Sequence, residues 1–217
     1  MSPEGMLSTD LFGYTVLRQL SQFVASIVFF NGSEYFLAAS IHGTSTVDSS
    51  SLLFSKQYCI AMTFAVFEYV IEFFLVPEVK ERWLMSNIGL GMVIVGEIIR
   101  KTGILTARRA FTHNIRIYYE DHHELITHGI YRNSATSVSL NIPCRIIRHP
   151  GYCGFFIWAV GTQLMLCNPI STVAFIVVTW RFFYKRIPYE EFFLREFFGS
   201  QHVEYTRKVP SGLPFIK

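Results

Sequence analysis

The polar residues with the most suggestive spacing stand at the two ends of an uncharged stretch, residues 150–180. Arg148 and His149 precede this stretch. Arg186 and Glu190 follow it four residues apart, a spacing that places both on one face of a helix. If the stretch folds back on itself as a helical hairpin, its two polar ends meet. Guanidinium, imidazole and carboxylate groups gathered in this way indicate a binding site for an anionic or zwitterionic ligand.

The histidines and cysteines do not form a recognisable metal motif. Five of the seven histidines fall between residues 113 and 149, but no His-Glu-x-x-His pattern occurs there. Hydrogen bonds to a ligand or across an interface are therefore the favoured interpretation of this histidine-rich segment, and no metal site is expected. The four cysteines contain no Cys-x-x-Cys pair and indicate neither a zinc ribbon nor a disulfide framework.

The composition favours a membrane protein. Of the 217 residues, 51% are hydrophobic and only 16% are charged, against roughly 25% charged in soluble domains. So few charges would leave the surface of a soluble globule largely apolar. The formal net charge of +3 does not indicate a polyanionic partner such as nucleic acid. The expected partner is the lipid bilayer.

Apolar segments of helical length predict an all-α, polytopic membrane bundle with about five transmembrane helices. The Asn-Pro dipeptide at 168–169 divides the uncharged stretch into the two arms of a hairpin. Carboxylates within the second and third segments are expected to face other helices rather than lipid. The expected segments are residues 17–40, 58–76, 83–105, 151–167 and 170–186.

The sequence divides into a tail at 1–16, three membrane helices within 17–106 and a catalytic region at 107–217. This last region contains the hairpin and a charged C-terminal tail. The basic residues of 107–149 and of the segment after residue 180 place both on the cytosolic side by the positive-inside rule.

Several sequence motifs occur along the chain. They are Gly-Thr-Gln-Leu-Met-Leu-Cys-Asn-Pro at 161–169, Trp-Arg-Phe-Phe at 180–183, Val-Pro-Ser-Gly-Leu-Pro-Phe-Ile at 209–216, Gly-Glu at 96–97, Phe-Thr-His at 111–113 and His-Gly-Ile-Tyr at 128–131. Together they resemble the isoprenylcysteine carboxyl methyltransferase family, in the short form found in plants. The resemblance extends over nearly the whole chain from residue 17 onward, and the motif of the hairpin is the most specific part. The Arg-His-Pro-x-Tyr string at 148–152 is shared with other membrane methyltransferases and with sterol reductases.

The resemblance implies an enzyme of the endoplasmic reticulum membrane with a cytosolic catalytic face. It would transfer a methyl group from S-adenosyl-L-methionine to the C-terminal carboxylate of a farnesylated or geranylgeranylated cysteine. Its protein partners would be CaaX-processed proteins such as small GTPases. A terminal carboxylate has a pKa of about 3.5 and is ionised at pH 7, so no general base is required. The enzyme must supply alignment and exclusion of water.

The motifs also imply roles for individual residues. Arg186 and Glu190 would be the catalytic pair. Arg186 would bind the substrate carboxylate, which a guanidinium fork matches in geometry, and Arg181 is the competing candidate for that role. Glu190 would meet the cationic end of the cofactor. The residues implied in cofactor binding are His123, Glu124, Leu125, Ile126, Tyr131, His149, Pro150, Gly151, Tyr152 and Glu190.

Residues 133–145 depart from the family pattern, in which Tyr131 is followed after only a few residues by Arg-His-Pro. This Ser/Thr/Asn-rich stretch, which includes Pro143, predicts an inserted loop between two halves of the cofactor pocket. Our hypothesis is a variant whose fold survives and whose activity is reduced. Two alternatives follow: a prenylcysteine-binding protein without activity and, on the shared Arg-His-Pro-x-Tyr motif, a membrane sterol reductase that uses NADPH.

Overall fold

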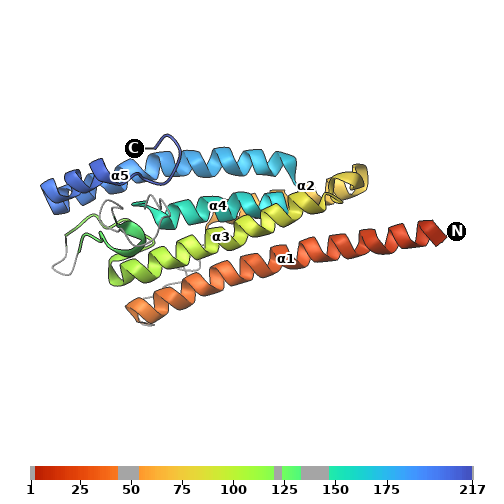
Figure 1. Ribbon diagram of the computed structural model, residues 1–217, viewed down its shortest axis with the longest axis horizontal. Helices are drawn as coiled ribbons and strands as arrows, with labels where there is room; N and C mark the ends of the chain where they lie inside the picture. The colour runs from red at the N-terminus through yellow and green to blue at the C-terminus, as the bar shows by residue number, and fades with distance from the viewer. Residues whose placement is uncertain (1–2, 44–53, 120–123, 133–146, 217) are drawn as a thin grey trace, which may run out of the picture. The chain divides into compact units, whose positions relative to one another are not determined.

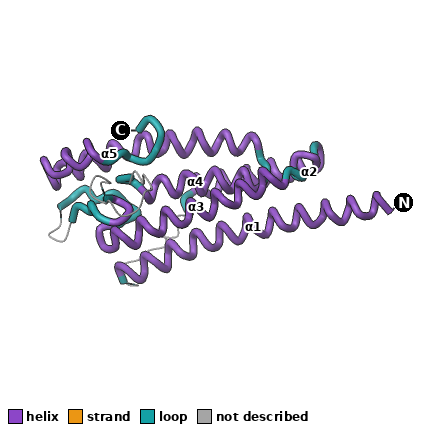
Figure 2. Tube along the Cα trace, in the orientation of Figure 1, coloured by secondary structure: helices purple, strands orange, loops and turns teal. Residues whose placement is uncertain are grey.

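The computed structural model describes residues 3–43, 54–119, 124–132 and 147–216. Within these ranges the secondary structure is helical, without a strand, as Figures 1 and 2 show. The all-α prediction is confirmed. The inserted loop expected at 133–145 and the cofactor residue His123 lie outside the described residues. The α-helices are α1 (Pro3–His42), α2 (Lys56–Leu75), α3 (Trp83–Ala107), α4 (Pro150–Met165) and α5 (Pro169–Lys208), and the short 3-10 turns are Pro77–Val79, Arg108–Ala110 and Gly129–Tyr131.

The helices coincide with the apolar segments of the sequence, with two larger differences. Helix α1 begins at Pro3, whereas the sequence predicts a tail at 1–16 and a helix from residue 17. Residues Gly13–His42 of α1 and the whole of α2 are long and apolar enough to cross a membrane.

The other difference is at the C-terminal end. Helix α5 does not end near residue 186 but continues through Pro188 to Lys208, with a kink at Gly199, where φ is 52° and ψ is -127°. Ile187 and Glu191, one turn apart, are both buried along this extension. Packing of that face therefore maintains the helix beyond its apolar part, since tertiary contacts override local propensity.

The described residues form two compact units. The first comprises residues 1–95 and 157–177. In its core Phe23 and Tyr69 pack with Met165 and Leu166, which lie at the end of α4. Helices α3 and α4 approach closely here, because a Cβ added to Gly89 would lie 2.1 Å from the backbone nitrogen of Met165. Glycine is thus required at this crossing.

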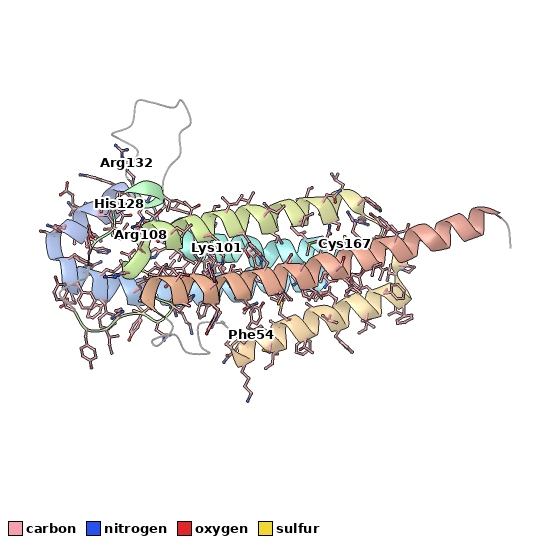
Figure 3. All side chains as sticks on the ribbon, turned by 90° about the horizontal axis from the view of Figure 1, so that it is seen from below. Phe54, Lys101, Arg108, His128, Arg132 and Cys167 are labelled. Carbon is pink, nitrogen blue, oxygen red and sulfur yellow. The ribbon has the colours of Figure 1, made fainter. Side chains whose placement is uncertain are left out.

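A lysine joins the turn that closes the α4–α5 hairpin to α2. Lys80 is fully buried. Its Nζ lies 2.6 Å from Oε2 of Glu72 and 2.8 Å from Oδ1 of Asn168, and it donates to the carbonyls of Leu166 and Cys167, each at 3.1 Å. Cys167, labelled in Figure 3, lies in the turn between α4 and α5. The ammonium thus satisfies carbonyls at the end of α4 that have no partner within their helix.

The other carboxylate of the same α2 face caps the start of α5. Glu68 accepts hydrogen bonds from the backbone N–H of Ile170, at 2.8 Å, and from that of Ser171, at 2.7 Å. A carboxylate at a helix N-terminus satisfies free N–H groups and complements the helix dipole. Glu68 and Glu72 therefore both face other parts of the protein, as their position in an apolar segment predicted.

The second unit comprises residues 96–156 and 178–217. Here α3 and α4 again meet at a glycine, because a Cβ on Gly154 would lie 2.6 Å from the backbone nitrogen of Arg100. Arg100 donates through Nη1 to the carbonyl of Gly151, at 2.8 Å, in the first turn of α4. The start of α4 is thereby fixed against α3.

The C-terminal segment 209–216 fixes the same region from another side. The backbone N–H of Arg148 donates to the carbonyl of Pro210 at 2.9 Å, and that of His149 to the carbonyl of Ser211 at 3.2 Å. Leu213 and Ile216 are buried in a cluster with residues of α5. The chain end therefore holds in place the two residues that precede α4.

Candidate active site

A cavity in the second unit is lined by most of the residues that the sequence motifs assign to the cofactor. Its walls come from the segments 110–116 and 124–131, the start of α4 and the C-terminal half of α5. Pro150 is not part of the lining, so its expected contact stays a prediction. The predicted residues that line the cavity are Glu124, Leu125, Ile126, Tyr131, His149, Gly151, Tyr152 and Glu190.

A tyrosine connects the two residues predicted to be catalytic. The hydroxyl of Tyr152 donates to Oε2 of Glu190 at 2.5 Å and accepts from Nε of Arg186 at 2.9 Å. Nη2 of Arg186 donates to the carbonyl of His113 at 2.6 Å. The guanidinium does not line the cavity itself but meets the lining at Tyr152. Arg186 and Glu190 therefore lie next to each other, both hydrogen-bonded to the same phenol.

A second acidic residue, Glu191, stands at the centre of a buried ionic cluster. Its Oε1 lies 2.6 Å from Nε of Arg148 and 2.7 Å from Nε2 of His149, and its Oε2 lies 3.3 Å from Nε2 of His202. All four side chains are buried and line the cavity. Nδ1 of His149 lies 3.9 Å from Oε2 of Glu190, so the imidazole stands between the two carboxylates.

The remaining wall of the cavity is largely aromatic and apolar. Tyr131 and Tyr205 connect its two sides, because the Tyr205 hydroxyl donates to the Tyr131 carbonyl at 2.8 Å. Aromatic faces beside a carboxylate suit a ligand that combines a flat ring system with a cationic group. The other apolar members of the lining are Ala107, Ala110, Phe111, Ile115, Phe193, Leu194, Phe197 and Phe198.

Comparisons with known proteins agree with the motifs. The model of the isoprenylcysteine carboxyl methyltransferase (ICMT) family matches residues 89–196. A relative from rice (Oryza sativa subsp. japonica) is 60% identical over 195 residues, which cover 90% of this chain and 95% of the rice protein. Protein-S-isoprenylcysteine O-methyltransferase A of Arabidopsis thaliana is 55% identical over 208 residues, covering 96% of this chain and 99% of the relative. The chain belongs to the isoprenylcysteine carboxyl methyltransferase family.

The fold of the methyltransferase agrees with that assignment. A solved structure of the eukaryotic intramembrane Ras methyltransferase ICMT matches with a TM-score of 0.84 and 34% identity, covering 93% of this chain and 68% of the other. The predicted family, the predicted enzyme class and the predicted membrane location are confirmed, and a sterol reductase is not favoured. The activity is methyl transfer to the carboxyl group of isoprenylcysteine, as the sequence predicts.

The motifs did not identify Glu191 or His202 as members of the site of the methyltransferase. A periodic pattern in α5 could have indicated Glu191. Ile187, Glu191, Leu194 and Phe198 follow one another at spacings of three or four residues, which places them in a row on one helix face. The sequence predicts burial only for the apolar residues of this row, because charged residues are seldom buried without partners. His202 lies beyond the kink at Gly199, so this spacing does not predict its position.

The Glu191 carboxyl gives the site a characteristic pH response. Burial by itself would raise its pKa, but hydrogen bonds from His149 and Arg148 and the electrostatic contributions of these two side chains outweigh burial and lower the pKa to about 2. A pKa below the ordinary value of 4.5 stabilises the folded state above that pH, and this contribution disappears as the pH falls towards 2.

We therefore expect Glu191→Gln to lower the free energy of unfolding by about 3 kcal/mol above pH 5, and progressively less between pH 5 and pH 2. The measurement is chemical unfolding in detergent across this pH range. Glu196→Gln, an exposed carboxylate on the same helix, is the control and should follow wild type throughout. A constant difference between Glu191→Gln and wild type would contradict the assignment.

Proposed function

We propose that this methyltransferase uses S-adenosyl-L-methionine to esterify the C-terminal carboxylate of farnesylated or geranylgeranylated cysteine in CaaX-processed proteins such as small GTPases. The supporting observation is the cavity in which the cofactor residues of the motif gather, with Arg186 attached to its lining through Tyr152. The names of the relatives, protein-S-isoprenylcysteine O-methyltransferase and Ras methyltransferase, support the substrate class.

The chemistry of the lining fits this cofactor. The adenine ring requires flat apolar surfaces, which Phe193, Phe197 and the neighbouring residues provide. The cationic end of the cofactor requires an anion, and Glu190 in the cavity lining is the proposed one. When bound, the sulfonium supplies an activated methyl group, and the protein's own residues hold and orient the reactants.

Arg186 is the proposed partner of the substrate carboxylate. A guanidinium carries five N–H donors, and the hydrogen bonds to Tyr152 and His113 use only Nε and Nη2. These two bonds fix the plane of the guanidinium in advance, so little side-chain freedom is lost when the carboxylate binds. The Tyr152 hydroxyl, which accepts from Arg186, also donates to Glu190, the residue proposed to bind the cofactor.

The chemical step then requires no proton transfer. The carboxylate is ionised at neutral pH, because its pKa is about 3.5, and is itself the nucleophile. The contribution of the protein is to align the carboxylate oxygen with the methyl group and to keep water out. A site of arginine, tyrosine and glutamate joined by hydrogen bonds, with apolar walls, meets these requirements without a general base.

The proposed location is the endoplasmic reticulum membrane, with the cavity open to the cytosol. The support is the basic character of the segment 107–149, which contributes a wall of the cavity. Basic segments next to membrane helices remain on the cytosolic side. This side also carries the soluble methyl donor and the processed ends of prenylated proteins.

The test is transfer of labelled methyl from S-adenosyl-L-methionine to N-acetyl-S-farnesyl-cysteine in membranes that contain this chain. Base-labile label above that of control membranes is the expected result. If full-length protein in the membrane transfers none, the variant lacking residues 133–145 decides between two causes. Activity of that variant alone would show that the insertion disables a methyltransferase, whereas inactivity of both would contradict the proposed reaction.

Glu190→Gln should weaken cofactor binding more than substrate binding. Loss of a charge-assisted hydrogen bond is worth about 1.5–3 kcal/mol, so the Kd for S-adenosylhomocysteine should rise roughly 10- to 100-fold. The KM for the prenylcysteine should change less than threefold. Calorimetric titration and initial rates give the two numbers, with Glu196→Gln as the matched exposed control. A larger change in KM than in Kd would reverse the assigned role.

A further inference from the structure

One histidine of the cavity wall has a role that no motif of the sequence assigns. His202 is 1% exposed and belongs to the lining. Its Nε2 faces Oε2 of Glu191 at 3.3 Å. Its other nitrogen, Nδ1, is buried and has no hydrogen-bond partner among the described residues. Buried polar atoms in folded proteins nearly always have a partner, so one left without a partner beside a ligand cavity points to the ligand.

The protonation state of this imidazole follows from its surroundings. Burial lowers the pKa of His202, so the ring is neutral at pH 7. A neutral imidazole has one N–H donor and one acceptor nitrogen. Since Glu191 remains ionised, its carboxylate 3.3 Å from Nε2 favours the tautomer that carries the proton on Nε2. Nδ1 is therefore a hydrogen-bond acceptor, and its missing partner is a donor.

The cavity around His202 indicates which part of the cofactor supplies this donor. Leu194 and Phe198 come before the kink of α5 at Gly199, Tyr205 follows His202 after it, and all three line the cavity. An apolar and aromatic wall of this kind accommodates the adenosyl part of the cofactor better than its charged amino-acid part. The adenosyl group has two kinds of donor, the exocyclic amino group of the base and the hydroxyls of the ribose.

We propose that His202 is a further cofactor-binding residue, whose Nδ1 accepts a hydrogen bond from an N–H or O–H donor of the adenosyl group. Glu191 is its positioning residue, because the contact with Nε2 selects the tautomer that leaves Nδ1 as the acceptor. This inference rests on the proposed use of S-adenosyl-L-methionine. It adds to the proposed function a residue that binds the adenosyl group and does not contact the reacting methyl group.

Two substitutions separate ligand binding from a purely structural contact with Glu191. Asparagine is shorter than histidine, and its side-chain oxygen reaches the position of Nδ1 while the contact with Glu191 is lost. Glutamine reaches the position of Nε2 and donates to Glu191, but leaves no acceptor at Nδ1. A ligand-binding role therefore predicts that His202→Asn retains cofactor affinity and that His202→Gln loses it. A structural role predicts the opposite order.

The experiment measures the Kd for S-adenosylhomocysteine by calorimetry on full-length protein in detergent. We expect a roughly tenfold increase for His202→Gln and less than a threefold increase for His202→Asn. His128→Gln changes an exposed histidine outside the lining, labelled in Figure 3, and should bind as wild type. Equal affinity of His202→Gln and wild type, or the reverse order of the two variants, would overturn the proposal.

A second arm uses wild type alone and does not depend on the folding of any variant. Two analogues of S-adenosylhomocysteine are titrated, one with purine in place of adenine and one with a deoxyribose. We expect one of them to bind roughly tenfold more weakly, which identifies the donor as the amino group or the hydroxyl. If both bind as tightly as S-adenosylhomocysteine, the inference about His202 is wrong. If wild type does not bind S-adenosylhomocysteine at all, the proposed function fails, and the inference fails with it.

Discussion

Arg186→Ala should reduce kcat/KM for N-acetyl-S-farnesyl-cysteine about a thousandfold and change the Kd for S-adenosylhomocysteine less than threefold. A thousandfold decrease corresponds to about 4 kcal/mol, within the range for removing one partner of a desolvated charge pair. The substrate carboxylate would lose its counter-ion. The cofactor contacts proposed for Glu190, Tyr131 and the aromatic wall would remain, since the hydrogen bonds of the guanidinium go to Tyr152 and to the His113 carbonyl and not to these side chains.

Arg186→Lys tests geometry as distinct from charge. Lysine keeps the positive charge but cannot reproduce the planar fork that holds Tyr152, the His113 carbonyl and a carboxylate together. We expect an intermediate loss, roughly 10- to 100-fold in kcat/KM. Full activity of Arg186→Lys would show that only charge matters at this position.

Arg181→Ala is the matched control on the same helix. Arg181 was the competing candidate for the substrate carboxylate, but it is exposed and does not line the cavity. We expect kcat/KM within threefold of wild type. If Arg181→Ala loses activity and Arg186→Ala does not, the two roles must be exchanged. If both variants lose cofactor affinity as well as kcat/KM, neither arginine has the specific role of binding the substrate carboxylate.

The architecture could be predicted because hydropathy alone determines which segments pack as long helices. The start of α3 at Trp83 and the turn at Asn168 followed from apolar length and from a Pro-containing dipeptide. The end of α5 could not, because residues 187–208 mix seven charged residues with apolar ones, and the helix there depends on buried side chains such as Ile187 and His202. The partners of these side chains lie far apart in the chain, and a local pattern does not identify them.

The site shows the same division between local and long-range information. Arg186 and Glu190 could be paired from their spacing of four, and most of the cofactor residues that the motifs assigned line the cavity. The phenol that connects them, Tyr152, belongs to another helix, so its bridging role required the structure. Glu191 illustrates the limit further, because its three partners come from two segments separated by more than 40 residues of chain.

The buried Lys80 leads to the largest expected effect on stability. Lys80→Met should lower the free energy of unfolding by about 3–5 kcal/mol, the range for breaking a buried ion pair by removing one partner. Methionine fills similar space, so the loss is mainly electrostatic. It leaves the Glu72 carboxylate without its ammonium, and the carbonyls of Leu166 and Cys167 without their donor. The measurement is denaturant unfolding of the detergent-solubilised protein.

A double substitution distinguishes the two contributions to the lost stability, the uncompensated charge of Glu72 and the carbonyl groups that lose their donor. Glu72→Gln in the Lys80→Met background removes the uncompensated carboxylate, and we expect it to restore about half of the lost stability. The unmet carbonyls at the end of α4 and the side chain of Asn168 account for the remainder. Lys56→Met, at an exposed position in α2, is the control and should stay within about 0.5 kcal/mol of wild type. If Lys80→Met also stays within that range, the ammonium does not stabilise the closed end of the hairpin, and packing of Met165 and Leu166 alone must hold it.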